Sequence, residues 1–121
     1  MSLHPRPWSV FLVALLACGI AAAHPHLRAA QPAAGGRARA VHELRLRFSE
    51  DLEPALSTVH LESGAGEAVV EPAATVARGD PRTLVLHLHQ KLPPGRYRVR
   101  WVAVGADGHR MHGTYWFTAS P

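Results

Sequence analysis

Short runs of alternating apolar and polar residues fill most of this chain, and turns containing glycine or proline separate them. A strand points successive side chains to opposite faces, so a period of two predicts half-buried β-strands. No segment shows a sustained helical period. The pattern therefore predicts an all-β domain, an antiparallel sandwich whose inward faces pack together. The clearest inward sets are Leu44, Leu46 and Phe48, then Leu84, Leu86 and Leu88, then Tyr97, Val99 and Trp101.

Turn signals set the order of the strands. They are Gly64-Ala65-Gly66, Gly79-Asp80-Pro81, Pro93-Pro94-Gly95 and Asp107-Gly108-His109. Val69-Val70 is expected to open a strand, and the last strand is expected from Thr114 to Thr118. The Ala/Gly-rich residues 31–39 are expected to form a loop. Without an internal repeat, residues 24–121 are predicted to form a single domain.

The first 23 residues have the features of a secretory signal peptide. Arg6 precedes an apolar run from Val10 to Ala23, and small residues occupy positions 21 and 23, as signal peptidase requires. The run is shorter than the roughly 20 apolar residues of a membrane span. We therefore expect residues 1–23 to be removed and the mature protein to work in the periplasm or outside the cell. An uncleaved anchor is the alternative.

Cys18 is the only cysteine in the chain. The segment Leu15-Leu16-Ala17-Cys18 resembles a bacterial lipobox, so a second alternative is a lipoprotein acylated at Cys18; the intact mass of the exported protein distinguishes the two. Cleavage after Ala23 would leave no cysteine, hence no disulfide and no thiolate ligand. A bound metal would then need nitrogen and oxygen donors, which excludes cysteine-type zinc sites and iron–sulfur clusters.

The formal net charge of +4 arises from arginines at alternate strand positions, such as Arg45, Arg47, Arg96, Arg98 and Arg100. This spacing is typical of a solvated strand face. A nucleic-acid-binding role would need a clustered basic patch with aromatic residues, and the sequence alone does not show one. No nucleic-acid partner is expected.

Cleavage after Ala23 would make His24 the first residue, with a free α-amine and an imidazole on one residue. Asp107 and His109 offer a carboxylate and a second imidazole across a turn, where residues i and i+2 point the same way. Three nitrogens and one oxygen suit the tetragonal preference of Cu(II). The residues predict a Cu(II) site formed by His24, Asp107 and His109.

His26 and His112 are possible auxiliary ligands. Histidine in third place could indicate a square-planar site that uses the amide nitrogens of the second and third residues, but Pro25 has no amide proton to lose. A strand-surface role is therefore expected for His26. His112 lies near His109 in sequence and could be a ligand or only a neighbour.

The other candidates are expected to be structural. His87 and His89 are predicted on the outward face of one strand together with Val85, as surface polar residues. His42 and His60 are lone strand histidines, and Glu50 with Asp51 is expected to form an acidic turn that caps the structure.

Several short motifs occur in a fixed order along the chain. They are the leader ending before His24, Leu27, Pro32, Leu46-Arg47-Phe48-Ser49-Glu50, Leu52, Leu92, Pro94-Gly95, Tyr97-Arg98-Val99-Arg100-Trp101, Ala106-Asp107-Gly108-His109 and the strand from Gly113 to Phe117. In this order and spacing, the chain resembles the CopC family of bacterial periplasmic copper-binding proteins.

The resemblance implies an immunoglobulin-like β-sandwich or barrel with Greek-key connections. It also implies a monomeric, non-enzymatic protein that binds Cu(II) through His24, Asp107 and His109, for copper buffering, trafficking or resistance. A separate CopD-type membrane protein is the implied recipient. Some members hold Cu(I) in a methionine-rich loop, but residues 24–121 keep only Met111, so that site is expected to be absent.

Two other classes of function stay open at this point. An amino-terminal histidine beside another imidazole also resembles the copper centre of enzymes that cleave polysaccharides by oxidation. A plain β-sandwich interaction domain with no metal is the third class.

Overall fold

The computed structural model describes residues 2–4, 25–69 and 71–121. Cys18, His24 and most of the predicted signal peptide lie outside the described residues. Within the described part of the chain, no helix is long and apolar enough to span a membrane.

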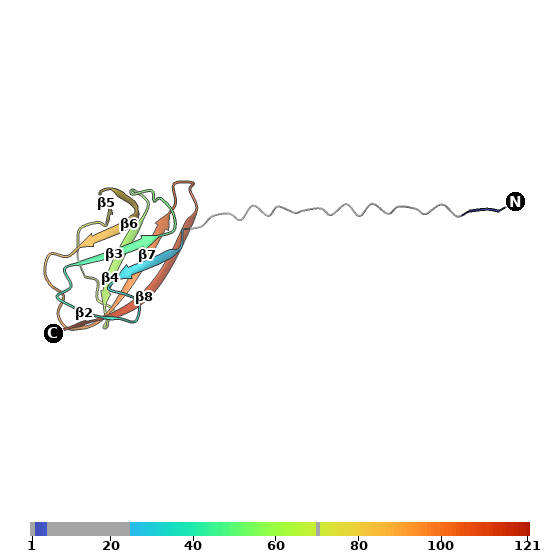
Figure 1. Ribbon diagram of the computed structural model, residues 1–121. Helices are drawn as coiled ribbons and strands as arrows, with labels where there is room; N and C mark the ends of the chain where they lie inside the picture. The colour runs from blue at the N-terminus through green and yellow to red at the C-terminus, as the bar shows by residue number, and fades with distance from the viewer. Residues whose placement is uncertain (1, 5–24, 70) are drawn as a thin grey trace.

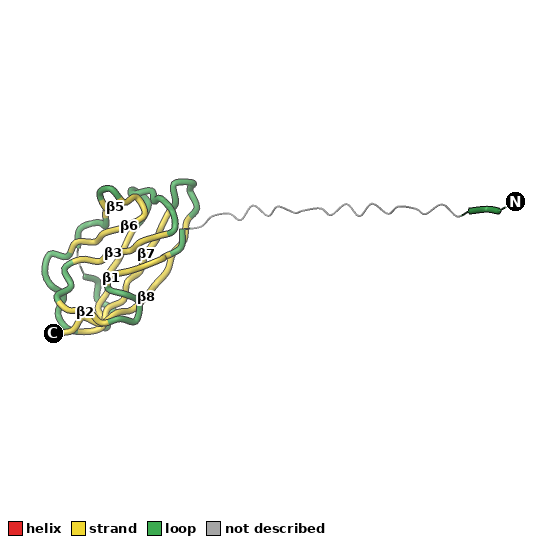
Figure 2. The backbone as a smooth tube through the Cα atoms, viewed as in Figure 1, coloured by secondary structure: helices red, strands yellow, loops and turns green. Residues whose placement is uncertain are grey.

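The described residues form two four-stranded sheets that pack face to face (Figures 1 and 2). One sheet has the order β1-β3-β6-β5, and the other has the order β2-β8-β7-β4. The strands are β1 (Leu27–Gln31), β2 (Arg37–Arg39), β3 (Glu43–Phe48), β4 (Thr58–Ser63), β5 (Thr75–Ala77), β6 (Asp80–His87), β7 (Gly95–Val104) and β8 (Arg110–Ser120). The all-β sandwich is thus as predicted.

The expected inward sets form the core. Leu44, Leu46 and Phe48 are almost fully buried on β3, as are Leu84 on β6 and Val99 on β7. The Phe48 ring meets Trp101 edge-on at 5.0 Å between centroids. Burial of each such side chain contributes about 1.5–3 kcal/mol to folding, so this layer supplies the stability of a domain whose described residues contain no cysteine.

Residues 31–39 are not simply a loop, which corrects the expectation from composition. Gln31 ends β1, and Arg37–Arg39 forms β2, which pairs in parallel with β8. The side chain of Ala38 packs against the core between two exposed arginines. This short alternation is hidden in an Ala/Gly-rich run. The sheet is consequently mixed and not purely antiparallel.

The prediction that a strand opens at Val69-Val70 is also wrong. Val69 donates its N–H to the carbonyl of Leu61, at 2.9 Å, without beginning a strand, and Val70 lies outside the described residues. Pro72, which has no N–H to donate, lies three residues after Val69, and the next strand is β5. The last strand is longer than predicted, because β8 begins at Arg110 and ends at Ser120.

Strand β6 differs from the prediction on its outward face. Val85 is only 3% exposed, although alternation placed it toward solvent. Its partners across the sheet are Arg45 on β3 and Thr75 on β5, and side chains on the same face from both neighbours cover it. His87 ends the strand and His89 lies beyond it, so the two histidines do not share a strand face.

Candidate metal centre

Asp107 and His109 lie in the tight turn that joins β7 to β8. The turn is closed by two backbone hydrogen bonds, from the N–H of Gly105 to the carbonyl of His109, at 2.8 Å, and from the N–H of Gly108 to the carbonyl of Gly105, at 2.9 Å. Gly108 has a φ of 88°, a conformation that glycine adopts without a Cβ clash. The Asp-Gly pair therefore acts as a turn signal and also fixes the site loop.

The two predicted ligands contact each other directly. His109 donates its backbone N–H to Asp107 Oδ1, at 3.0 Å, and its ring Nδ1 lies 2.8 Å from Asp107 Oδ2. Both side chains are 45% exposed. The structure thus brings together a nitrogen and an oxygen donor that face solvent.

The pKa values of the pair move apart. Hydrogen bonds from the ring and the backbone of His109 lower the pKa of Asp107 below its usual value. The hydrogen bond to Asp107 raises the pKa of His109, and the negative charges of Asp107 and Glu50 raise it further. In the metal-free protein the pair therefore favours holding a proton between carboxylate and imidazole.

Glu50 lies beside Asp107, a proximity that the sequence did not predict. A Cβ built on Gly105 would lie 2.8 Å from Glu50 Oε2 and 2.9 Å from Asp107 Oδ1. Two carboxylates therefore converge over Gly105, and both would have to shift if this residue carried a Cβ. Asp51 does have the structural role that was expected, because its carbonyl accepts the N–H of Ala106 and its carboxylate pairs with Arg82.

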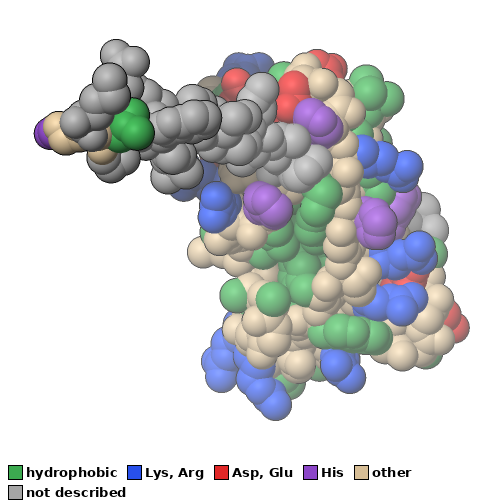
Figure 3. Space-filling view, turned by 90° about the vertical axis from the view of Figure 1, so that its right-hand side faces the viewer, with side chains coloured by type: hydrophobic (Ala, Val, Ile, Leu, Met, Phe, Trp, Pro, Cys, Tyr) green, Lys and Arg blue, Asp and Glu red, His purple; other side chains and the backbone are tan. Residues whose placement is uncertain are grey.

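The start of the described domain is attached beside this loop. His26 donates its N–H to Ser49 Oγ, at 2.9 Å, and Ser49 returns its N–H to the carbonyl of His26, at 2.9 Å. Pro25 is almost fully buried. Figure 1 shows β1 beginning at the end of the sandwich where the β7–β8 hairpin turns, and in Figure 3 acidic and histidine side chains lie side by side at that end. His24, the next residue toward the N-terminus, lies outside the described residues.

The other histidines are spread over the surface. His26 is exposed, and His112 points outward from β8 in a shallow depression that His60 also lines. His87 lies 3.5 Å from a carboxylate oxygen of Glu43. Among the described residues, no three His, Cys, Asp or Glu side chains are grouped closely enough to hold a metal ion.

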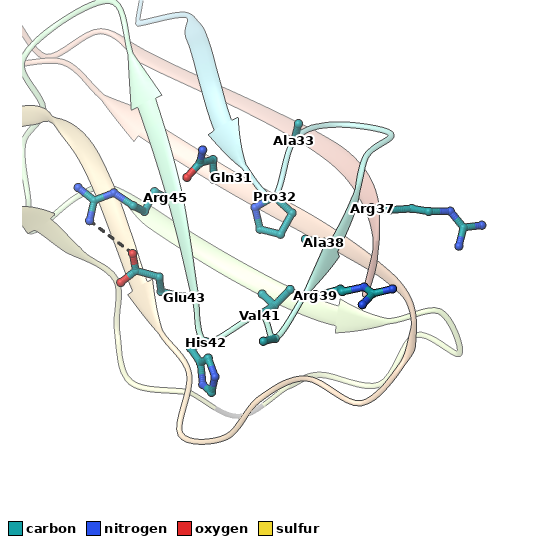
Figure 4. Close-up of a pocket in the computed structure, with 11 residues that line it drawn as sticks. Gln31, Pro32, Ala33, Arg37, Ala38, Arg39, Val41, His42, Glu43 and Arg45 are labelled. Atoms are coloured by element: carbon teal, nitrogen blue, oxygen red, sulfur yellow. Dashed lines mark ion pairs between the residues drawn. The ribbon is translucent and has the colours of Figure 1, made fainter. Parts of the chain in front are cut away.

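A cavity lies elsewhere, at the open side of the sandwich between β1 and β2. It has a volume of about 430 Å³. Figure 4 shows Arg37 and Arg39 pointing away from it, while Arg45 on its other side pairs with Glu43. Polar groups do not converge on its interior, so it lacks the ligand cluster of a metal site.

Comparison with known proteins agrees with the arrangement of strands and loop. The model of the CopC domain family matches residues 27–120. The chain belongs to the CopC family. This confirms the family that the sequence resembled, and the match begins just after His26.

Curated CopC relatives and solved CopC structures cover most of this chain. Copper resistance protein C of Escherichia coli is 36% identical over 104 residues, which are 81% of this chain and 82% of the relative. Copper resistance protein C of Pseudomonas syringae pv. tomato is 32% identical over 114 residues, 90% of each chain.

Among solved structures, CopC from Methylosinus trichosporium OB3b has a TM-score of 0.74 at 33% identity and covers 81% of this chain and 95% of its own. PcoC from Escherichia coli, described as a methionine-rich copper resistance protein, has a TM-score of 0.74 at 32% identity and covers 81% of this chain and 100% of its own. These likenesses confirm the CopC fold. Membership in a family of copper resistance proteins also supports the expectation of a binding protein and not an enzyme.

Proposed function

We propose that this protein binds Cu(II) in the periplasm through the α-amine and imidazole of His24 together with Asp107 and His109. The observation that carries the proposal is the contact between Asp107 and His109 at the end of the domain where His26 is bonded to Ser49. Only Pro25 separates His24 from His26, so His24 has little chain with which to move away from this end.

The spacing of the two donors suits a metal ion. Neighbouring donors at about 2 Å from a tetragonal metal ion are about 2.8 Å apart, taking usual metal–nitrogen and metal–oxygen distances. Asp107 Oδ2 and His109 Nδ1 have this separation, at 2.8 Å, around a proton. A Cu(II) ion would replace that proton, so copper affinity is expected to fall as pH falls.

Charge supports the same ligands. Cu(II) would bring two positive charges beside Asp107 in place of the single charge of a proton. The carboxylate of Glu50 adds a second negative charge over Gly105. Oxygen and nitrogen donors favour Cu(II), whereas Cu(I) prefers thioether and thiolate sulfur. Met111, the only methionine of residues 24–121, is partly buried against the core and offers one thioether.

The role that fits this site is capture of Cu(II) for buffering or resistance, followed by transfer to a membrane partner of the CopD type. Relatives named copper resistance protein C support the copper-related role. The predicted signal peptide over residues 1–23 supports the location. In this proposal the protein acts as a monomer and performs no catalysis.

Electron paramagnetic resonance of the exported protein with one equivalent of Cu(II) tests the ligand set. We compare it with a variant that carries one extra alanine before His24, with Asp107→Asn, and with His42→Gln as a control away from the site. The expected result is a spectrum that changes for the first two variants and not for the control. An unchanged spectrum for the extended variant would remove the amine of His24 from the site.

A further inference from the structure

Strand pairing gathers arginines on the outer face of the β2-β8-β7-β4 sheet. Residues paired across a sheet point to the same side, and the register aligns Arg37 with Thr118 and Arg96, and aligns Arg98 with Trp116 and Glu62. We call this surface the arginine face; its arginines are Arg37, Arg39, Arg96, Arg98, Arg100 and Arg110. Their side chains are exposed or partly exposed, as the sequence predicted, but the fold concentrates them.

The arginine face has a large positive excess. Glu62 is the only carboxylate among the outward-facing strand residues of this sheet that the structure describes. It pairs with both Arg98 and Arg100. For Arg37, Arg39, Arg96 and Arg110 the described part of the chain contains no carboxylate partner. Such an excess of like charge raises the energy of the free surface and attracts an anionic partner.

Trp116 orders the centre of the arginine face. The guanidinium of Arg96 lies 4.3 Å from the centroid of the indole, and that of Arg98 lies 5.7 Å away. Both distances allow a cation–π interaction. The partly buried indole therefore holds two guanidinium groups on the sheet. Arg98 is engaged by Glu62, whereas the N–H groups of Arg96 stay available to anions.

A shallow depression near the β7–β8 turn extends the arginine face. Arg100, Arg110, His60, His112 and Thr114 line it, and its volume is about 360 Å³. All five side chains can donate hydrogen bonds, and none is a carboxylate. Two guanidinium groups with a hydroxyl form the kind of donor set that binds a phosphate group.

We propose that the arginine face docks the protein on an anionic phospholipid surface. A stable protein interface needs an apolar centre, whereas the outward-facing strand residues described on this face include only three apolar side chains, Trp116, Val102 and the buried Val104. Arginines with one interfacial tryptophan suit a layer of phosphate headgroups. Docking places the Asp107–His109 turn at the border of the contact. This position serves copper transfer if the proposed function holds. The docking itself needs no copper.

Vesicle co-sedimentation of the exported, copper-free protein tests this proposal. The vesicles contain phosphatidylcholine alone or phosphatidylcholine with phosphatidylglycerol. The test variant is Arg37→Gln with Arg96→Gln. The matched control is Arg28→Gln with Arg47→Gln, which removes the same charge from the other sheet. Thermal melts establish that both variants fold, and copper binding is measured separately, so that a failure of either proposal is recognised on its own.

We expect binding to the phosphatidylglycerol vesicles that weakens with added salt, and no binding to phosphatidylcholine alone. Each arginine at an anionic surface contributes about 1 kcal/mol, so the test variant should bind about 30-fold more weakly, and the control should bind at least tenfold more tightly than the test variant. Equal losses in the two variants, or no binding by the unmodified protein, would overturn the proposal. So would tighter binding to polyglutamate or to duplex DNA, which would assign the face to an acidic protein or to nucleic acid.

Discussion

His26 and Ser49 exchange two hydrogen bonds, each 2.9 Å long, and so attach the start of the domain to the residue before Glu50. The Ser49 hydroxyl therefore connects the position of the chain start to that of the Glu50 carboxylate beside the candidate site.

Ser49→Ala should weaken Cu(II) binding by about fivefold, because one hydrogen bond that fixes the chain start is worth about 1 kcal/mol. The melting temperature should fall only slightly. Isothermal titration with Cu(II) in a competing chelator measures the affinity. Ser63→Ala, which removes a hydroxyl bonded to the N–H of Glu67 in a distant turn, is the control and should bind copper normally. Equal affinity in the two variants would contradict the role of Ser49.

Asp107→Asn should lower the pKa of His109 toward its ordinary value of 6.5, because the hydrogen bond and negative charge of Asp107 raise it. NMR titration of the metal-free protein follows the His109 ring directly. The His87 ring serves as an internal reference far from the substitution. If His109 titrated identically in both proteins, the ring of His109 would not be bonded to Asp107 in solution.

Gly105→Ala should lower copper affinity and leave the stability of the fold nearly unchanged. The new methyl group would meet the ends of two flexible side chains, Glu50 and Asp107, and these can move away at little cost to folding. Moving Asp107 displaces a proposed ligand, and we expect a loss of copper affinity of about 10–100-fold, as for other disturbances around metal ligands. Affinity titration and thermal melting of the same sample measure both effects. Unchanged affinity would show that the carboxylates do not converge on the ion.

Glu62→Gln should make the stability of the fold less sensitive to acid, because it removes a carboxylate that stabilises the fold only while it is ionised. Hydrogen bonds from Arg98 and Arg100 lower the pKa of Glu62 below its ordinary value of about 4.5. A carboxylate whose folded-state pKa is depressed stabilises the fold above its unfolded pKa, and that contribution is lost as pH falls from about 4.5 through the folded value. Melting temperatures from neutral to acidic pH measure this loss. It should be smaller in Glu62→Gln than in the control Glu53→Gln, which removes an exposed carboxylate from the segment between β3 and β4. Parallel curves would contradict it.

Gly113→Ala should destabilise the fold. A Cβ at this position would lie 2.4 Å from Cζ2 of Trp101, a ring packed against Phe48 that cannot simply turn away. Overpacking of this kind costs about 1–3 kcal/mol. Denaturant unfolding followed by tryptophan fluorescence measures it. A variant that also carries Trp101→Phe should recover part of the loss, and no recovery would place the strain elsewhere.

Much of the fold follows from local patterns. Leu44, Leu46 and Phe48 alternate with arginines, and the alternation alone predicts their burial. β2 is different, because only three residues pair and the signal is a single Ala38 between arginines. Val85 also escaped prediction, since its burial depends on Arg45 and Thr75 from neighbouring strands, and strand order is not encoded in a local period.

The candidate site was also only partly predictable from the sequence. Asp107 and His109 are two residues apart, so their contact follows from a turn that the Asp-Gly pair predicts. Glu50 is far from them in sequence, and its place over Gly105 depends on the segment after β3, where Leu52 bridges to Gly105 and the carbonyl of Asp51 accepts the N–H of Ala106. Knowing that the segment after β3 pairs with the end of β7 would have indicated it, but that contact joins the two sheets and has no local sequence signal.

The burial of Pro25 has a practical consequence for work with this protein. Because the interior already takes up the ring at position 25, any affinity tag or fusion joined at the amino end would begin one residue away from the packed domain and would cap the amine that copper is proposed to need. Pro121 is exposed at the opposite end of the molecule (Figure 1), so purification handles belong there.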